Sequence, residues 1–346
     1  MTKTTVLIVD DSRTMRAVIR ARLAADPDIM VIGEAADPYE AREAIKALNP
    51  DVVTLDVEMP KMNGLEFLEK LMRLRPTPVI MISTLTQSGA AASIEALALG
   101  AFDVVGKPAG TEFSTAFEDL AEKVKAAAES PLGVVARKAI EKQKVVEADI
   151  GNTDKIVFIG ASTGGVEALM QVIGSVPADC PPTLITQHMP AQFTTSFAAR
   201  LDASSSAQVM EAYDGAPLKQ GVVYLAPGGG RHLALGPGQN ATCRLFEGDL
   251  VSGHRPSVDV LFQSAARLQD KAIGVILTGM GADGAAGLKS MRDAGAYTIG
   301  QDRQSCVVYG MPRVAFEAGG VIEQVSLSKV AGAIGRACAR TQRAAS

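Results

Sequence analysis

The sequence predicts an α/β protein built from two doubly wound domains with parallel sheets. First, a chain of 346 residues is longer than one hydrophobic core usually supports. Second, apolar runs alternate with helical patterns over residues 4–129, and this alternation restarts at Asp154. Third, a charged stretch without dense strand-like runs lies between the two halves. We therefore predict a first domain over 1–125, a linker over 126–152 and a second, larger domain over 153–346.

Five short apolar runs in the first half predict a five-stranded parallel sheet. They are rich in β-branched residues and apolar on both faces, as strands buried in a parallel sheet should be. In chain order they read TTVLIV, MVIGEA, DVVTL, PVIMI and DVVG. The segments between them have helical periodicity, and one such stripe is formed by Met15, Val18, Ile19 and Leu23. This alternation predicts an open sheet with helices on both faces.

The second half predicts a larger, mostly parallel sheet. Its strand-like runs include KIVFIG, PTLITQ, KAIGVILTG and AYTIG, and its helical patterns include VDVLFQSAARL and AAGLKSMRDAG. Residues 208–247 contain the turn-forming stretches DGAP, LAPGGG and ALGPGQN between short strand-like pieces. We predict that this region is a β-hairpin insertion in the second domain.

Composition excludes several classes of function. The net charge is −4 and the sequence pI is about 5.6, which disfavours a general nucleic-acid surface, and the chain has no Trp to form a stacking platform. No run of 18 apolar residues and no signal-peptide pattern occurs, so direct membrane insertion is not expected. The isolated cysteines have neither paired nor metal-ligand spacing, and they are Cys180, Cys243, Cys306 and Cys338. A cytoplasmic location is expected.

Acidic residues follow two of the predicted strands in the first half. Asp10 and Asp11 come after the first strand, Asp56 after the third, and Lys107 after the fifth. Because the carboxyl ends of parallel strands meet at one edge of the sheet, these side chains should converge. Clustered carboxylates suit Mg²⁺, and a lysine opposite them suits a phosphoryl group. The alternative is a set of solvated loop acids.

The first half resembles the receiver domain of response regulators. The resemblance rests on VDDS, LDVEMPKMNG, Ser83-Thr84 and Lys107-Pro108, and it implies a flavodoxin-like fold. It further implies that Asp56 is the phosphoacceptor and that Ser83 and Lys107 form the switch. The implied Mg²⁺ ligands are Asp10, Asp11, Asp56 and the backbone carbonyl of Glu58. One position departs from the common pattern, because Val104 stands where many receivers have an aromatic switch residue.

A serine-containing turn follows the first strand of the second half. The stretch IGASTGG, residues 159–165, has a serine where a dinucleotide-binding loop would need its second glycine. It fits the pattern G-x-S-x-G instead, in which a strained turn between a strand and a helix exposes a nucleophilic hydroxyl. From these residues alone, Ser162 is either a nucleophile or the N-cap of the next helix.

A nucleophilic serine needs a base, and the chain has three histidines. His188 directly follows the run TLITQ and should lie at the same sheet edge as Ser162, whereas His232 lies in the turn-rich insertion and His254 in a loop. Asp283, after the strand IGVIL, could orient the imidazole of His188. A structural histidine and a turn aspartate are the alternatives.

The second half resembles the catalytic domain of the CheB family of chemotaxis methylesterases. The matching stretches are IGASTGG, TQHMP, YLAPGG, HRPSVDVLF, VILTGMGADGAAG and CVVYGMP. The resemblance implies a triad of Ser162, His188 and Asp283. It also implies that the backbone amides of Thr163 and Met280 bind the oxyanion.

The resemblance further implies a function and partners. The expected activities are demethylation of glutamyl methyl esters on chemoreceptors and deamidation of receptor glutamines, with no cofactor for the esterase reaction and Mg²⁺ for receiver phosphorylation. A chemotaxis histidine kinase is the expected phosphodonor, and phosphorylation is expected to relieve inhibition. The alternative is a non-enzymatic response regulator whose second half only binds a partner.

Overall fold

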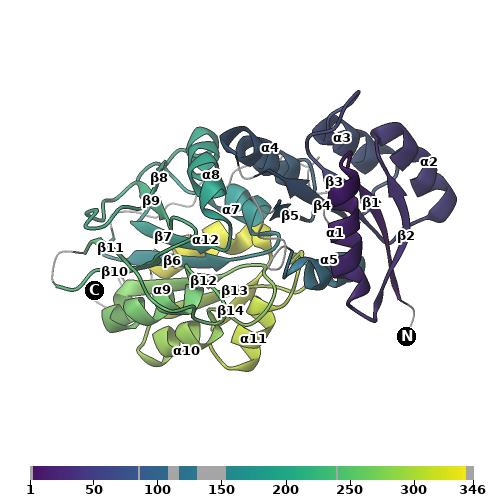
Figure 1. The fold of residues 1–346 in the computed structure, drawn as a ribbon. Helices are drawn as coiled ribbons and strands as arrows, with labels where there is room; N and C mark the ends of the chain where they lie inside the picture. Colours follow the sequence, from purple (N-terminus) through teal and green to yellow (C-terminus); the bar gives the residue numbers. More distant parts are fainter. Residues whose placement is uncertain (1–2, 85, 108–116, 131–152, 239–240, 340–346) are drawn as a thin grey trace. The chain divides into compact units, whose positions relative to one another are not determined.

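The computed structural model divides the chain into two compact units, Met1–Lys142 and Gln143–Ser346 (Figure 1). It describes residues 3–84, 86–107, 117–130, 153–238 and 241–339. The predicted linker over 126–152 lies outside the described residues from position 131 onward, so the predicted domain boundaries stay a prediction.

The first unit contains a five-stranded, wholly parallel sheet with the strand order β2-β1-β3-β4-β5. Its strands are β1 (Thr4–Val9), β2 (Ile29–Ala35), β3 (Val52–Asp56), β4 (Val79–Ser83) and β5 (Asp103–Gly106). The five described helices are α1 (Arg13–Ala24), α2 (Pro38–Leu48), α3 (Gly64–Leu74), α4 (Gln87–Ala98) and α5 (Leu120–Glu129). The predicted five-stranded parallel fold is therefore confirmed.

Local sequence explains where these helices begin. Short polar side chains that accept hydrogen bonds from first-turn amides precede α1, α2 and α3, and they are Ser12, Asp37 and Asn63. The predicted stripe on α1 is only partly buried, because Ile19 and Leu23 are buried whereas Met15 and Val18 are half-buried. Thus two of its four residues face the core fully.

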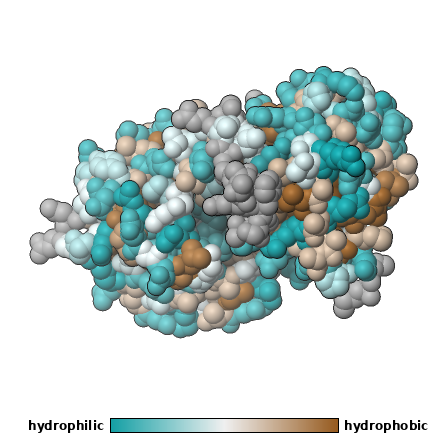
Figure 2. Space-filling model, in the orientation of Figure 1, coloured by the Kyte–Doolittle hydropathy of each residue, from teal (hydrophilic) through white to brown (hydrophobic). Residues whose placement is uncertain are grey.

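Strand β2 differs from the prediction that every strand is apolar and buried on both faces. It lies at the edge of the sheet, and Met30 in this strand is 47% exposed. On the face shown in Figure 2, hydrophobic side chains collect over the β2 edge of the first unit, whereas the second unit shows them singly among polar neighbours. An edge strand has only one neighbour, so its outer side chains stay near water.

The second unit contains a seven-stranded parallel sheet with the order β14-β13-β12-β6-β7-β9-β8. Its strands are β6 (Ile156–Ala161), β7 (Thr183–Gln187), β8 (Gln208–Glu211), β9 (Val222–Leu225), β12 (Ala272–Ile276), β13 (Tyr297–Gln301) and β14 (Glu323–Val325). A separate antiparallel hairpin is formed by β10 (His232–Leu235) and β11 (Cys243–Phe246). The predicted insertion is thus confirmed as β10–β11, but it is narrower than predicted, because β8 and β9 belong to the main sheet.

Helices cover both faces of this sheet (Figure 1). One face carries α7 (Gly165–Ile173), α8 (Ala191–Ser204) and α12 (Val330–Ala339), and the other carries α9 (Val258–Ala265), α10 (Ala285–Asp293) and α11 (Met311–Glu317). Two short 3₁₀ helices, η1 (Ala266–Lys271) and η2 (Leu327–Lys329), complete the unit. Phe158 of β6 and Phe262 of α9 are fully buried in the core between the sheet and α9. In the described ranges, no helix combines the length and the apolar character needed to cross a membrane.

The strand order fixes the place of the functional site. Strand β6 lies between β12 and β7, and the chain leaves it first toward β7 and later returns to β12 on its other side. Such a reversal is a topological switch point, where the loops at the carboxyl ends of the strands separate and leave a crevice. The loops that follow β6, β7 and β12 therefore open at one sheet edge.

Candidate active site

The serine loop follows β6 and is held by main-chain hydrogen bonds. The amide of Ser162 donates to the carbonyl of Thr278, at 3.0 Å, and the amide of Gly165 donates to the carbonyl of Ser162, at 2.7 Å. The N-cap of α7 is Gly164, with a φ of 76°, which a glycine adopts without strain. Ser162 is therefore not the N-cap of this helix, and its hydroxyl is available for another partner.

The first glycine of the G-x-S-x-G pattern is required by packing. A Cβ atom on Gly160 would lie 2.1 Å from Cγ1 of Val258, the first residue of α9. We predict that Gly160→Ala lowers the free energy of unfolding by about 1–3 kcal/mol, because overpacking a buried contact forces neighbours apart. Urea denaturation measures this change. Gly230→Ala is the matched control, since a Cβ atom there would meet nothing within 4 Å; equal stability of the two variants would contradict the prediction.

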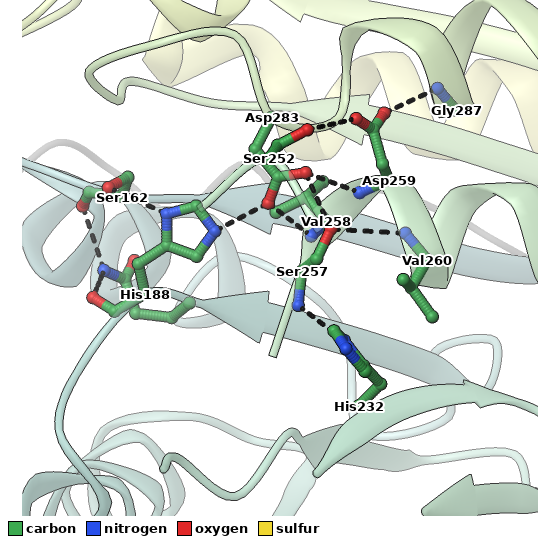
Figure 3. Close-up of polar contacts among 11 residues, drawn as sticks. Ser162, His188, His232, Ser252, Ser257, Val258, Asp259, Val260, Asp283 and Gly287 are labelled. Atoms are coloured by element: carbon green, nitrogen blue, oxygen red, sulfur yellow. Dashed lines mark hydrogen bonds and ion pairs between the residues drawn. The ribbon is translucent and has the colours of Figure 1, made fainter. Parts of the chain in front are cut away.

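Three predicted side chains form a hydrogen-bonded row at this edge (Figure 3). His188 Nδ1 lies 3.1 Å from the hydroxyl oxygen of Ser162, and His188 Nε2 lies 2.8 Å from Oδ2 of Asp283. An ionised carboxylate only accepts, so Nε2 carries the proton of the neutral ring. Nδ1 is then free of a proton and can accept the hydrogen of the serine hydroxyl.

Asp283 is buried and receives several donors. The amide of Val258 donates to its Oδ2 at 2.7 Å, and the amide of Asp259 and the hydroxyl of Ser257 donate to its Oδ1 at 3.0 and 2.8 Å. Burial raises the pKa of the Asp283 carboxyl, but the hydrogen bond from His188, the positive charge of its ring when protonated, and the α9 amides outweigh burial and hold the pKa below its ordinary value. The carboxylate is thereby kept ionised beside the imidazole.

The neighbouring Asp259 behaves in the opposite way. Burial, with a further contribution from the negative charge of Asp283, raises the pKa of the Asp259 carboxyl. This side chain accepts from the amide of Gly287 at 2.7 Å and from the hydroxyl of Ser252 at 3.1 Å. Two adjacent buried carboxyls thus differ in their tendency to ionise, and the one beside His188 is the more acidic.

Gln187 joins the serine loop to the histidine, a contact that sequence reasoning missed. Its side-chain Nε2 donates to the carbonyls of Ser162, at 2.9 Å, and of His188, at 3.0 Å. A Cβ atom on Gly165 would lie 2.0 Å from Oε1 of Gln187, which explains the glycine there. The available signal was a polar residue at the end of a buried strand, directly before His188. Gln187 fixes the spacing of the two loops.

The predicted oxyanion amides lie in segments next to Ser162. Thr163 follows the serine directly, and its carbonyl accepts from the Thr278 hydroxyl at 3.0 Å. Gly279 lies so close that a Cβ atom there would be 2.8 Å from the Cβ atom of Ser162. The amide of Met280, the next residue, donates to no group within the part of the chain that the structure describes.

In the first unit, three carboxyl groups gather where β1 and β3 end. Oxygens of Asp10, Asp11 and Asp56 all lie within 4.8 Å of one another. The ammonium of Lys107 pairs with Asp56 at 2.8 Å and with Asp10 at 3.1 Å. Burial raises the pKa of Asp56 to about 6, with the charge of Asp10 adding to the rise and the hydrogen bond from Lys107 opposing it. The carboxylate oxygens of these three acids form a set of ligands that fits Mg²⁺, and the single ammonium of Lys107 leaves the cluster with excess negative charge.

The other predicted receiver residues surround this acidic cluster. The amide of Glu58 donates to Oδ1 of Asp56 at 3.2 Å, so the turn after β3 folds back on the carboxylate. Ser83 ends β4, beside β3, and its hydroxyl donates to the carbonyl of Gly89 at 3.1 Å. The amide of Lys107 donates to the carbonyl of Ser83 at 2.7 Å. Val104 is buried in β5, so this position holds a small core side chain.

The fold and the site define a class of protein: a parallel α/β domain with the Ser–His–Asp arrangement found in serine hydrolases, in one chain with a receiver-type domain. Residues 157–334 match the model of the CheB methylesterase family, and residues 6–118 match that of the response regulator receiver domain. The chain belongs to the CheB methylesterase family, which confirms the resemblance seen in its sequence.

Curated relatives resemble the chain over nearly its whole length. The protein-glutamate methylesterase/protein-glutamine glutaminase 1 of Caulobacter vibrioides is 60% identical and covers 95% of this chain and 96% of its own. The corresponding protein of Agrobacterium fabrum is 58% identical, with 94% of each chain covered. The crystal structure of the Thermotoga maritima CheB methylesterase catalytic domain is 39% identical, covers 53% of this chain and 97% of its own, and has a TM-score of 0.51.

Proposed function

We propose that this protein is a phosphorylation-activated protein-glutamate methylesterase and protein-glutamine glutaminase of bacterial chemotaxis. Its substrates would be glutamyl methyl esters and particular glutamines on chemoreceptors, and its place of action the cytoplasm. The observation that supports this most is the hydrogen-bonded row of Ser162, His188 and Asp283 at the ends of three adjacent parallel strands, in a chain of the CheB methylesterase family.

The geometry supports a two-step acyl transfer. The hydroxyl oxygen of Ser162 attacks the ester carbonyl carbon while His188 Nδ1 takes the hydroxyl proton. The imidazolium so formed is stabilised by the ionised Asp283 at Nε2, and the amides of Thr163 and Met280 would bind the oxyanion. When the tetrahedral intermediate collapses, His188 returns the proton to the leaving methoxide and methanol departs.

Hydrolysis of the acyl-enzyme repeats these steps with water. His188 Nδ1 takes a proton from water, whose oxygen attacks the glutamyl ester of Ser162, and the proton then returns to the serine oxygen. The product is a receptor glutamate. A receptor glutamine would follow the same path and release ammonia, because the amide forms the same kind of tetrahedral intermediate. The esterase reaction needs no cofactor in this scheme.

Methanol release from a methylated chemoreceptor fragment tests the proposal. We expect release by the protein and stimulation by a small phosphodonor. The competing function is a partner-binding output domain without enzyme activity. A serine-directed organophosphonate separates the two, since an activated serine is labelled covalently. Absence of labelling and of methanol release, with the phosphodonor present, would favour the binding module.

For the first unit, we propose that Asp56 accepts a phosphoryl group from a chemotaxis histidine kinase and that this modification relieves inhibition of the esterase. Asp10, Asp11, Asp56 and the Glu58 carbonyl would hold Mg²⁺, which neutralises phosphoryl charge when bound. The ion pair of Lys107 with Asp56 supports a role for this ammonium in binding the added phosphoryl oxygens, and the hydroxyl of Ser83 would act as the switch hydroxyl.

Asp56→Asn is expected to abolish stimulation by the phosphodonor and to leave basal methanol release unchanged, because the amide cannot accept the phosphoryl group. The phosphodonor should raise methanol release by the wild type about 5–150-fold, the usual size of an allosteric coupling, and this increase should be absent in the variant. Methanol release with and without phosphodonor measures it. Asp28→Asn, at an exposed acid of the same unit, is the control and should keep full stimulation. Stimulation that persists in Asp56→Asn would exclude Asp56 as the phosphoacceptor.

A further inference from the structure

His232 is a buried histidine outside the row formed by Ser162, His188 and Asp283. It begins the hairpin strand β10 and is 1% exposed. Its Nδ1 accepts from the amide of Ser257 at 3.2 Å, and its Nε2 faces the carbonyl of Asp249 at 2.8 Å. The backbone N–H of Ser257 can only donate, so Nδ1 carries no proton. The carbonyl oxygen of Asp249 can only accept, so the proton of the neutral ring is on Nε2. Both ring nitrogens are therefore used.

The two partners of His232 are the ends of one loop, Asp249–Ser257, which we name the support loop. A tight turn closes its middle, where Val251 and His254 exchange two main-chain hydrogen bonds and both intervening residues, Ser252 and Gly253, have positive φ. By bonding the amide at one end and the carbonyl at the other, the imidazole fixes the distance between the ends of the support loop.

The support loop contacts two members of the row directly. The ring of His254 stacks on the ring of His188, with centroids 3.7 Å apart and an interplanar angle of 15°. The hydroxyl of Ser257 donates to Asp283 at 2.8 Å (Figure 3). The same loop therefore packs against one face of the His188 ring and donates a hydrogen bond to one carboxylate oxygen of Asp283.

We propose that His232 is a positioning residue for the esterase reaction, which acts through the support loop on His188 and Asp283. It holds Ser257 where its hydroxyl reaches Asp283, and it holds the turn that stacks His254 on His188. The stack restricts rotation of the His188 ring, so that Nδ1 stays toward Ser162 and Nε2 toward Asp283. This inference rests on the proposed function.

Two isosteric variants divide the role of His232. In His232→Asn the amide oxygen takes the place of Nδ1 and still accepts from Ser257, but the donor to Asp249 is lost. In His232→Gln the amide nitrogen takes the place of Nε2 and still donates to Asp249, but the acceptor for Ser257 is lost. We expect both to lower kcat for methanol release by about 10–100-fold with little change in KM, because small misplacements of reacting groups cost rate. His232→Gln should lose more, since Ser257 is the end that contacts Asp283.

Two further measurements distinguish positioning from general damage. The rate of organophosphonate labelling of Ser162 should fall in parallel with kcat, and the low-field proton NMR signal of the His188–Asp283 hydrogen bond should shift or broaden. Cys243→Ala, at a buried residue of the same hairpin that lies on the other strand, is the control and should keep all three properties. Wild-type labelling rates in folded His232→Asn and His232→Gln would overturn the proposal.

A second pair keeps the proposal testable if the His232 variants do not fold. His254→Phe retains a flat ring over His188, whereas His254→Ala removes it, so labelling should be near normal in the first and slower in the second. Equal rates in the two variants, whether normal or reduced, would overturn the role of the stack. If the wild-type protein neither releases methanol nor is labelled with the phosphodonor present, the proposed function fails; if the wild type does both and the positioning variants behave like it, this inference alone fails.

Discussion

Ser162→Ala is expected to lower methanol release by about 10⁴–10⁶-fold, because removing the nucleophile of a Ser–His–Asp triad leaves only oxyanion and substrate binding. The hydroxyl contacts His188 Nδ1, so alanine also removes one hydrogen bond, worth about 0.5–1.5 kcal/mol of stability. The variant should therefore fold and still accept a phosphoryl group at Asp56. Methanol release, organophosphonate labelling and phosphorylation by a small phosphodonor measure the three properties.

Ser290→Ala is the matched control for this experiment. Ser290 lies on the exposed side of α10, and its hydroxyl donates only to the carbonyl one turn earlier, at Ala286. It should retain full activity and labelling. If Ser162→Ala kept most of the methanol release of the control, another group would have to attack the ester, and the proposed mechanism would be wrong.

The sequence predicted the fold and the assembly of the site because both depend on short, local patterns. Apolar runs separated by helical stripes specify a parallel sheet, and the carboxyl ends of its strands share an edge. Ser162 after β6, His188 after β7 and Asp283 beyond β12 were therefore expected at one sheet edge, and the strand order β12-β6-β7 brings them together. Their catalytic roles, and that of Asp56, stay predictions that the variants test.

What the sequence did not predict depends on pairing between distant segments. Strands β8 and β9 are short and flanked by turns, so periodicity alone could not assign them to the main sheet rather than to the insertion. The same reason applies to the supporting contacts of Gln187, Ser257 and His232. Each is a common polar residue whose hydrogen-bond partner is fixed by tertiary structure, 25 residues away in the cases of Ser162 with Gln187 and Ser257 with His232.

Asp283→Asn is expected to lower kcat by about 10³–10⁴-fold, and the structure shows why neither orientation of the amide can replace the carboxylate. If the amide nitrogen faces His188, it meets the amide of Val258 as a second donor and forces the imidazole proton onto Nδ1, toward Ser162. If the amide oxygen faces His188, the amide nitrogen faces the backbone N–H of Asp259, so that two donors meet. In either orientation the imidazolium loses its negatively charged partner. Methanol release as a function of pH measures the loss.

The same substitution has a pH-dependent effect on stability. Because the pKa of Asp283 is lowered in the folded protein, the unfolded chain binds more protons between that pKa and the ordinary value of about 3.9. The stabilisation by the ionised carboxylate is thus fully present above about pH 4 and is lost as the pH falls through the folded pKa. The difference in unfolding free energy between the wild type and Asp283→Asn should shrink in that direction, as denaturation at several pH values would show.

Asp259→Asn is the control that separates this effect from the loss of any buried acid. Asp259 accepts from the amide of Gly287 and contacts the hydroxyl of Ser252, and an asparagine can accept from the first and donate to the second. Burial and the charge of Asp283 raise the pKa of Asp259, so its replacement removes a costly negative charge rather than a useful one. We expect Asp259→Asn to keep its rate within about threefold, less than the usual loss of one catalytic contact. Equal losses in Asp259→Asn and Asp283→Asn would mean that the buried acids act as one structural pair, and Asp283 would lose its separate role toward His188.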